Sequence, residues 1–240
     1  MKAIILSAGQ GSRLLPLTQD RPKCLLDIGG RSIIEHQVDL LVAEGIRQIT
    51  VVIGYMGLKV REVLGSRVVY CENDLFASTS SMYSLWLARD AAADGFLVVN
   101  SDVLFHGDIL KSLLNSPHGD ALAVDFESVM AEEEMKVQVR DGRVVALSKQ
   151  LSNGDGENLG MVKLTAEGSR VLFTKIDELL RQNHRQVMVP FALNAIAPSY
   201  DLAAVPVQGL PWIEIDFPED YERAREVVYP AIRRELRQPS

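Results

Sequence analysis

Short apolar runs alternate with amphipathic stretches from the first residues of the chain. Residues 3–6 and 49–53 are apolar runs of strand length, whereas residues 32–44 place apolar side chains at helical spacing after Ser32, a candidate N-cap. Strands that alternate with helices favour βαβ units around a mainly parallel sheet. The alternation therefore predicts an α/β fold. The expected strands are 3–6, 49–53, 68–70, 96–99, 136–140, 143–148, 160–164 and 212–215, and the expected helices are 32–44, 59–64, 84–93, 109–114, 166–182 and 218–228.

The middle of the chain is richer in strands than the rest. Asp141-Gly142 lies between two alternating runs, which is a hairpin signal, and Asn153-Gly154 marks another turn. We therefore expect a Rossmann-like three-layer α/β/α arrangement with a mainly parallel mixed sheet and a small β-rich lobe. Residues 1–230 are expected to form one domain, divided into halves 1–125 and 126–230. The charged tail 231–240 is expected to fray after Pro230.

Composition and charge exclude several classes of protein. Hydrophobic residues make up 47% of the 240 residues and the net charge is −7, so a disordered chain and a nucleic-acid binder are both disfavoured. Cys24 and Cys71 are far apart, which implies neither a disulfide framework nor a structural zinc site. No run reaches the roughly 18 apolar residues of a membrane span. The apolar start of the chain is too short for a signal peptide, so we expect a cytoplasmic protein without membrane insertion.

A glycine-rich segment directly follows the first expected strand. Gly9 and Gly11 allow a tight turn and close approach of the backbone to a ligand. The peptide N–H groups of such a loop can bind phosphate oxygens, and Arg13 and Lys23 are cations suited to the same ligand. A simple strand-to-helix turn that requires small residues is the competing interpretation.

Two known phosphate-binding motifs do not match this segment. The dinucleotide-binding fingerprint requires a third glycine or alanine where Leu14 stands, which argues against an NAD-dependent dehydrogenase. The Gly-Lys-Ser/Thr sequence of a P-loop is also missing.

A longer pattern around the loop resembles the signature of the nucleotidyltransferase superfamily, which includes the sugar-phosphate nucleotidylyltransferases and the bacterial phosphocholine cytidylyltransferases. It consists of Ala8-Gly9-Gln10-Gly11-Ser12-Arg13-Leu14, Pro16-Leu17-Thr18, Arg21-Pro22-Lys23 and Leu25. The resemblance implies the nucleotide-diphospho-sugar transferase type of fold. It also implies that Arg13 and Lys23 neutralise the phosphates of a nucleoside triphosphate, and that the loop binds the nucleotide through Leu6, Ala8, Gly9, Gln10, Gly11 and Ser12.

Two acidic residues follow expected strands. Asp102 comes after the apolar run 96–99, and carboxyl ends of parallel strands face the ligand crevice of α/β sheets. Asp216 ends the run 212–216, in which Trp212, Glu214 and Asp216 share one face of a strand. A turn cap and a solvated strand edge are the competing interpretations. The resemblance implies that Asp102 and Asp216 bind Mg²⁺ and that Ser101 contacts the nucleotide.

The remaining candidates concern the base and the acceptor. By resemblance, Tyr83 and Ser84 contact the nucleoside, although Ser80-Ser81 stands where this branch usually has an Asn pair and could simply cap a helix. By the same resemblance, Lys136 and Glu157 are acceptor-binding candidates, and a surface hairpin is the competing interpretation of that region. Trp212 and Glu214 are further acceptor-binding candidates, and Tyr83, Trp86 and Trp212 are candidate aromatic faces for a quaternary ammonium. We expect Glu132-Glu133-Glu134 to be solvated.

These features together favour a Mg²⁺-dependent nucleotidylyltransferase of the phosphocholine cytidylyltransferase type. Arg13, Lys23, Asp102 and Asp216 are the expected catalytic residues. The expected partners are a nucleoside triphosphate, with CTP favoured, and a small phosphorylated acceptor, with phosphocholine favoured over aminoethylphosphonate. No nucleic-acid partner is expected, and a homodimer is left open. The alternatives are a sugar-1-phosphate nucleotidylyltransferase and a non-catalytic nucleotide-binding module.

Overall fold

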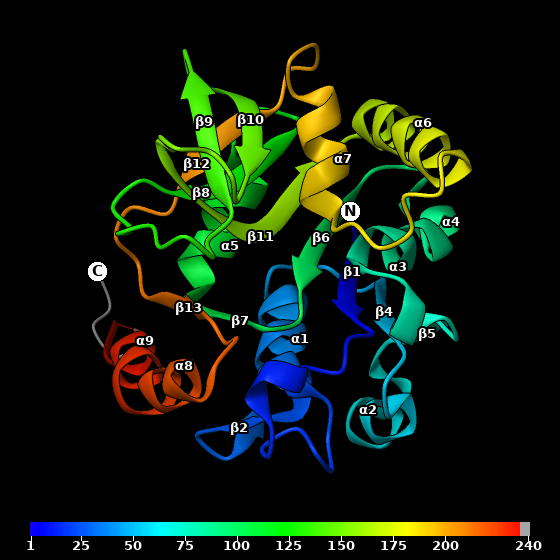
Figure 1. Cartoon of the computed structure of the whole chain (residues 1–240). Helices are drawn as coiled ribbons and strands as arrows, with labels where there is room; N and C mark the ends of the chain where they lie inside the picture. The colour runs from blue at the N-terminus through cyan, green and yellow to red at the C-terminus, as the bar shows by residue number, and fades with distance from the viewer. Residues whose placement is uncertain (236–240) are drawn as a thin grey trace.

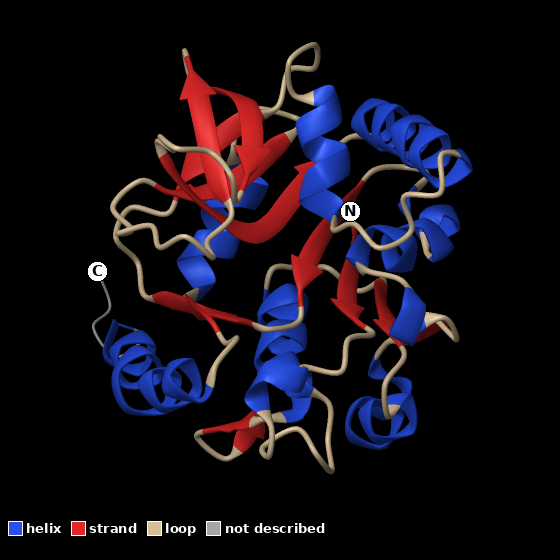
Figure 2. Cartoon of the chain, in the orientation of Figure 1, coloured by secondary structure: helices blue, strands red, loops and turns tan. Residues whose placement is uncertain are grey.

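The computed structural model describes residues 1–235, and a mixed nine-stranded sheet forms the centre of this part of the chain (Figures 1 and 2). The strand order is β5-β4-β1-β6-β11-β8-β12-β10-β9. Both halves of the chain contribute to this one sheet, because β6 pairs with β11. The strands are β1 (Lys2–Ser7), β4 (Ile49–Ile53), β5 (Val69–Glu72), β6 (Phe96–Asn100), β8 (Ala121–Asp125), β9 (Lys136–Arg140), β10 (Arg143–Ser148), β11 (Gly156–Leu164) and β12 (Ala203–Pro206).

Parallel and antiparallel pairing occupy different parts of the sheet. The strands β5, β4, β1 and β6 are parallel to one another, and β12 is parallel to β8. The long strand β11 runs antiparallel to β6, β8 and β9, and β10 is antiparallel to β9 and β12. Asp141 and Gly142 both have positive φ, as a two-residue hairpin between β9 and β10 requires.

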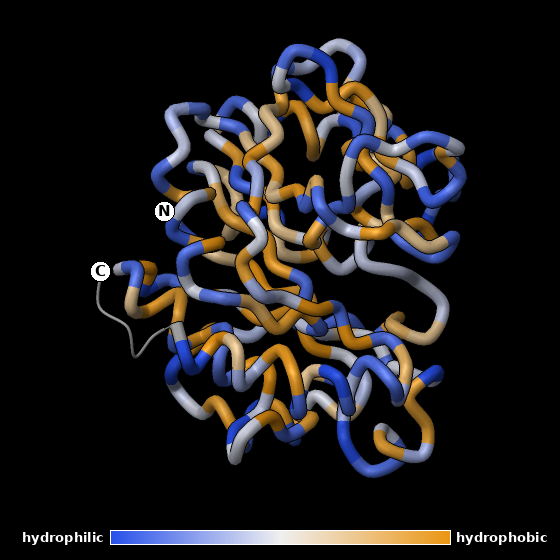
Figure 3. Tube along the Cα trace, turned by 90° about the vertical axis from the view of Figure 1, so that its left-hand side faces the viewer, coloured by the Kyte–Doolittle hydropathy of each residue, from blue (hydrophilic) through white to orange (hydrophobic). Residues whose placement is uncertain are grey.

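Helices cover both faces of the sheet, which gives the three-layer α/β/α fold expected from the sequence. Ala3 and Ile5 of β1 face a core shared with α1 and α5, whereas Ile4 and Leu6 face one shared with α3, α6 and α7. Figure 3 shows the more hydrophobic segments passing through the middle of the molecule. The helices are α1 (Ile33–Ala43), α2 (Gly57–Leu64), α3 (Ser81–Leu87), α4 (Arg89–Ala92), α5 (Gly107–Asn115), α6 (Ala166–Arg181), α7 (Val189–Ile196), α8 (Pro218–Arg223) and α9 (Tyr229–Glu235).

Several boundaries differ from the sequence-based expectation. The helix expected over 84–93 begins at Ser81 and is divided at Ala88, and β11 begins four residues before the expected strand 160–164. The strands β8 and β12 and the helix α7 were not predicted. Each is a short apolar run, and periodicity alone does not distinguish a buried strand from a buried helix of that length.

The end of the chain returns to its beginning. The strand β13 (Trp212–Glu214) pairs with β7 (Val103–Phe105) in a small separate sheet, and α8 and α9 follow it. Their apolar side chains pack against residues that follow the glycine-rich loop, including Leu14 and Ile28. Fraying after Pro230 was expected, but α9 runs to Glu235 because Ile232 is buried in this cluster. The rest of the expected tail, 236–240, lies outside the described residues.

Within residues 1–235, the helices are too short or too polar to cross a lipid bilayer.

Candidate active site

The glycine-rich loop is held tightly against its neighbours. Gly11 has φ +67°, and a Cβ there would lie 3.0 Å from the Cβ of Lys23. The Thr18 hydroxyl donates to the Gly11 carbonyl at 2.8 Å, which fixes the turn. At Gly54, a Cβ would lie 2.7 Å from the Ala8 carbonyl oxygen, so β4 also approaches the loop at a position that excludes a side chain. The loop therefore has a rigid backbone of the kind that binds phosphate through N–H groups.

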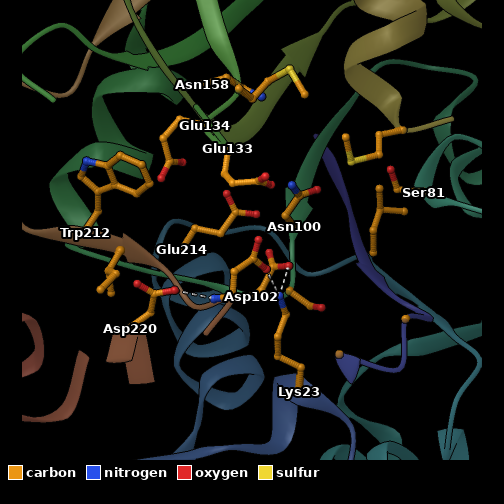
Figure 4. A pocket seen from close by; sticks show the side chains of 18 of the residues that line it. Lys23, Ser81, Asn100, Asp102, Glu133, Glu134, Asn158, Trp212, Glu214 and Asp220 are labelled. Atoms are coloured by element: carbon orange, nitrogen blue, oxygen red, sulfur yellow. Dashed lines mark hydrogen bonds and ion pairs between the residues drawn. The ribbon is translucent and has the colours of Figure 1, made fainter. Parts of the chain in front are cut away.

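The loop opens onto a cavity of about 960 Å³ that is lined by the ends of β1 and β6 and by parts of β11 and β13 (Figure 4). Ser81 and Ser84 of α3 lie at one end, beside Met188 and Pro190, whose neighbour Val189 hydrogen-bonds Ser81. Trp212 lies at the other end, with several carboxylates (Figure 4). The predicted site residues that line this cavity are Leu6, Ala8, Gly9, Gly11, Ser12, Arg13, Lys23, Ser84, Ser101, Asp102, Glu157, Trp212, Glu214 and Asp216.

A compact charge cluster lies beneath the loop. The Nζ of Lys23 is 2.8 Å from Asp102 and 2.6 Å from Asp216, and Arg13 donates to the other oxygen of Asp216 at 2.7 Å. Burial would lower the pKa of Lys23, but the two carboxylates outweigh burial and raise it above its ordinary value. Burial would likewise raise the pKa of Asp216, but Lys23 and Arg13 hold it below the usual range. Lys23 and Asp216 are therefore both charged at neutral pH.

Separate segments bring the two aspartates together. Asp102 lies in the turn between β6 and β7, where Gln37 of α1 donates to the carbonyls of Asn100 and Val103 at 2.8 and 2.7 Å. Asp216 follows β13, and the Ile215 N–H donates to the Asp102 carbonyl at 3.0 Å. The antiparallel pairing of β7 with β13 thus places two carboxylates side by side that are more than a hundred residues apart in sequence.

Three carboxylates in this cluster have the geometry of a cation site. Asp102, Glu214 and Asp216 each offer an oxygen, and these oxygens lie within 4.8 Å of one another. The Oδ1 of Asp102 is buried without a hydrogen-bond partner. Burial, together with Asp102 and Asp216, raises the pKa of Glu214 to about 8. Hard oxygen donors with unmet bonding capacity fit a hard divalent cation such as Mg²⁺.

The end of the cavity near Trp212 carries more acidic side chains than the sequence suggested. Glu132 and Glu133 are exposed, as expected, whereas Glu134 is half-buried, and Glu133 and Glu134 both line the cavity. Burial first, and then a hydrogen bond with Glu134, raise the pKa of Glu157 to about 8, and Ser128 also hydrogen-bonds Glu157. The loop between β8 and β9 folds back over β11, and no local sequence signal indicates that contact.

Lys136 does not line the cavity. Its Nζ donates to the carbonyl oxygens of Lys149 and Glu132, at 2.8 and 3.3 Å. Lys149 of the neighbouring segment lines the cavity instead. The predicted contact of Lys136 with an acceptor is therefore not supported by its position, because β9 directs the side chain toward its own hairpin.

The three aromatic candidates do not lie together in the cavity. Tyr83 stacks on Trp86 with ring centroids 5.5 Å apart, and Trp86 donates to Asp177 at 2.7 Å. Neither ring lines the cavity, since adjacent residues of a helix point in different directions and Ser84 faces it. The Gln10 side chain does not line it either. Trp212 does, and its Nε1 donates to Asp125 at 2.8 Å.

Comparison with known proteins decides the family. Residues 3–195 match the model of the MobA-like NTP transferase domain. The chain belongs to this family. It is thus a nucleotidyltransferase, as the glycine-rich signature predicted.

Two relatives of this nucleotidyltransferase align over nearly their whole length. A CTP:phosphoglutamine cytidylyltransferase from Campylobacter jejuni is 26% identical over 92% of the chain and 98% of the relative. A choline-phosphate cytidylyltransferase from Streptococcus pneumoniae is 26% identical over 95% of the chain and 98% of the relative. The solved structure of a CTP:phosphocholine cytidylyltransferase from Streptococcus pneumoniae shares the fold, with a TM-score of 0.76 and 23% identity over 94% of the chain and 98% of that structure. The Rossmann-like α/β prediction is confirmed.

Proposed function

We propose that this nucleotidyltransferase is a Mg²⁺-dependent cytidylyltransferase for a small phosphorylated or phosphonylated acceptor. An acceptor oxygen forms a bond to the α-phosphorus of CTP, the bond from that phosphorus to the β-phosphate bridge breaks, and pyrophosphate leaves with the electron pair. The observation that carries the proposal is the convergence of Lys23, Asp102 and Asp216 under the glycine-rich loop. The two cytidylyltransferase relatives support the choice of CTP.

The chain supplies position and charge. Backbone N–H groups of Gly9 to Ser12 and the cations Arg13 and Lys23 bind the triphosphate and stabilise the charge that moves onto the departing pyrophosphate. Asp102 and Asp216, with Glu214 beside them, would hold the metal ion. When bound, Mg²⁺ supplies charge neutralisation and Lewis-acid polarisation of phosphate oxygens. Little covalent work is left for the protein in phosphoryl-type transfer.

The acidic end of the cavity is our candidate for the acceptor subsite. Trp212 and the acidic side chains of Glu134 and Glu157 line it, and an aromatic face beside acidic groups suits a cationic group on the acceptor. Phosphocholine is the first candidate and 2-aminoethylphosphonate the second. Of the three aromatic side chains considered from the sequence, Trp212 alone lines the cavity. Because one aromatic face makes an incomplete cage for a quaternary ammonium, the preference for phosphocholine over 2-aminoethylphosphonate is smaller than the sequence suggested.

Pyrophosphate release tests the proposal. CTP, UTP, GTP and ATP should each be combined with phosphocholine, 2-aminoethylphosphonate and glucose 1-phosphate, with Mg²⁺ or with EDTA. We expect release with CTP and a cationic acceptor, abolished by EDTA. Preference for the sugar phosphate would overturn the acceptor assignment, and release in EDTA would overturn the metal assignment. Nucleotide binding without release from any pair would favour a binding module.

A further inference from the structure

Asn73 is a buried side chain whose orientation is fixed by a backbone contact. It follows β5, is 1% exposed, and its Oδ1 accepts the Leu75 N–H at 3.0 Å. Because a backbone N–H can only donate, the oxygen must be on that side and the amide nitrogen on the other. The Nδ2 accordingly donates to Thr79 at 3.1 Å and to Ser84 at 3.0 Å.

This fixed orientation determines what the Ser84 hydroxyl can do. Its oxygen accepts from Asn73, so its hydrogen is left to donate elsewhere. Thr79, in the same situation, gives its hydrogen to the Leu75 carbonyl at 2.8 Å. Among residues 1–235 no acceptor takes the Ser84 hydrogen, although Ser84 is 3% exposed and borders the cavity. The side chain is therefore a donor held ready for a ligand.

The Ser81 hydroxyl is also left to act as a hydrogen-bond donor. Its oxygen accepts the N–H of Val189 at 3.1 Å, which again leaves the hydroxyl hydrogen without an acceptor in the described part of the chain. Ser81 also borders the cavity, on the side opposite Trp212 (Figure 4). Residues three apart lie on the same face of a helix, so α3 presents Ser81 and Ser84 together.

The position of this pair matches the base of a bound nucleotide. The phosphates belong over the glycine-rich loop, and the carboxylates occupy the cavity on the side away from α3. Met188 and Pro190 border the cavity near the serines and provide apolar surface for a flat, uncharged ring. A ligand group placed here meets two hydroxyl donors.

We propose that Ser81 and Ser84 donate hydrogen bonds to two acceptors on the edge of the nucleobase. Asn73 is the positioning residue, because its hydrogen bond to the Ser84 oxygen leaves the Ser84 hydroxyl free to donate. Cytosine offers adjacent acceptors at N3 and O2, whereas uracil has a donor at N3. The pair therefore selects cytosine over uracil. This inference rests on the proposed function. To the nucleoside contact that the resemblance implies for Ser84, it adds Ser81 as a second donor and Asn73 as the residue that orients Ser84.

Asn73→Asp reverses the polarity with almost no change in shape. A carboxylate only accepts, and the Leu75 N–H still donates to it, so Ser84 must turn its hydrogen toward residue 73. Ser84 then presents a lone pair to the base and loses its preference for cytosine. We expect the CMP-to-UMP ratio of binding constants, measured by calorimetry, to fall about tenfold or more, and the CTP-to-UTP ratio of kcat/KM to fall with it.

A second test variant and a control variant complete the experiment. Ser84→Ala removes the donor without burying a charge, and we expect it to lower the same ratio several-fold even if Asn73→Asp folds poorly. Ser78→Ala is the matched control, because Ser78 is exposed and donates only to the Leu75 carbonyl, at 3.2 Å. It should leave the ratio unchanged.

The outcomes separate this inference from the proposed function. Wild-type protein that binds no nucleotide overturns the proposed function. A wild-type preference for CMP that Ser84→Ala and a folded Asn73→Asp leave within twofold overturns the inference alone. A wild-type preference for GMP over CMP overturns the assignment to cytosine.

Discussion

Lys23 shows how one side chain can serve both the folded protein and its reaction. It holds Asp102 and Asp216 in the free protein, and the proposed reaction requires its charge at the triphosphate. Its Cβ also packs against the turn at Gly11, so the position of the ammonium is tied to that of the loop. A single buried cation thus links the glycine-rich loop to the carboxylate cluster.

Replacing Lys23 with alanine should therefore depress turnover. We expect kcat to fall about 100- to 1000-fold, as for loss of one preorganised donor to transition-state charge, because no other side chain replaces this ammonium. Steady-state pyrophosphate release measures the effect. Lys111→Ala is the control, since Lys111 is an exposed lysine of α5. A Lys23→Ala rate within threefold of wild type would contradict the role.

Glu157 makes stability depend on pH. Burial and Glu134 raise its folded-state pKa to about 8, whereas in the unfolded chain it is near the ordinary value of about 4.3. Between these values the folded state holds a proton that the unfolded state has lost, so this contribution to stability falls as pH rises toward 8. Metal-free Tm measured from pH 5 to 9 should decline in wild type and decline less steeply in Glu157→Gln. Parallel curves would contradict the assignment.

At the scale of elements, α1 supports the site from beneath the sheet. Glu35 accepts from the N–H and hydroxyl of Ser32, at 2.9 and 2.6 Å, which fixes the start of the helix. One turn later, Gln37 reaches the turn that carries Asp102. A helix that contributes no side chain to the cavity thus positions one of its carboxylates.

Gln37→Met should weaken that support. The variant loses two hydrogen bonds and leaves two carbonyls unpaired, which we expect to cost about 2 kcal/mol and to lower Tm by about 4–8 °C. The EDTA-sensitive activity should fall with it as Asp102 loses its fixed position. Gln48→Met, at an exposed glutamine, serves as the control for thermal unfolding. Equal Tm values for the two variants would show that the contacts of Gln37 are unimportant.

Local signals in the sequence predicted the elements that position the glycine-rich loop. The apolar run of β1, the cap at Ser32 and the glycines at 9 and 11 are each encoded within a few residues, and the structure contains them as expected. Asp102 could be placed because it closely follows an apolar strand. These predictions required no knowledge of long-range packing.

The parts of the site that could not be predicted depend on contacts between distant segments. Glu134 meets Glu157 only because a loop folds over β11, and Asn73 meets Ser84 only after β5 and α3 have packed. The predicted contact of Lys136 with the acceptor is not supported for the same reason, because its Nζ is held by the Lys149 carbonyl in the neighbouring strand segment. Side-chain orientation in such contacts is set by tertiary packing, not by periodicity.

At the scale of the whole molecule, the last helices close over the first loops. Gly29 has φ +66°, and a Cβ there would collide with the ring of Tyr229 in α9. The neighbouring Gly30 has φ +86° but has open space around its Cα. Contact between the two ends of the fold therefore requires a glycine at position 29 for space as well as for conformation.

This pair of glycines provides a matched test. Gly29→Ala and Gly30→Ala both place alanine at a positive φ, so both should lower stability by about 1 kcal/mol or more. Only Gly29→Ala also displaces Tyr229, and we expect its Tm to fall further. The double variant Gly29→Ala/Tyr229→Ala should lose less than the sum of the two single variants. Additive losses would contradict the collision.

The pairing of β7 with β13 also determines when, during protein synthesis, the charge cluster can form. Synthesis proceeds from the N-terminus, so the glycine-rich loop is made before Asp216, which follows almost two hundred residues later. At roughly 5–20 residues per second, that interval lasts on the order of ten seconds or more. A nascent chain on the ribosome therefore carries Lys23 and Asp102 without their third partner, and the three charged groups can meet only after Asp216 and the preceding strand β13 have been made.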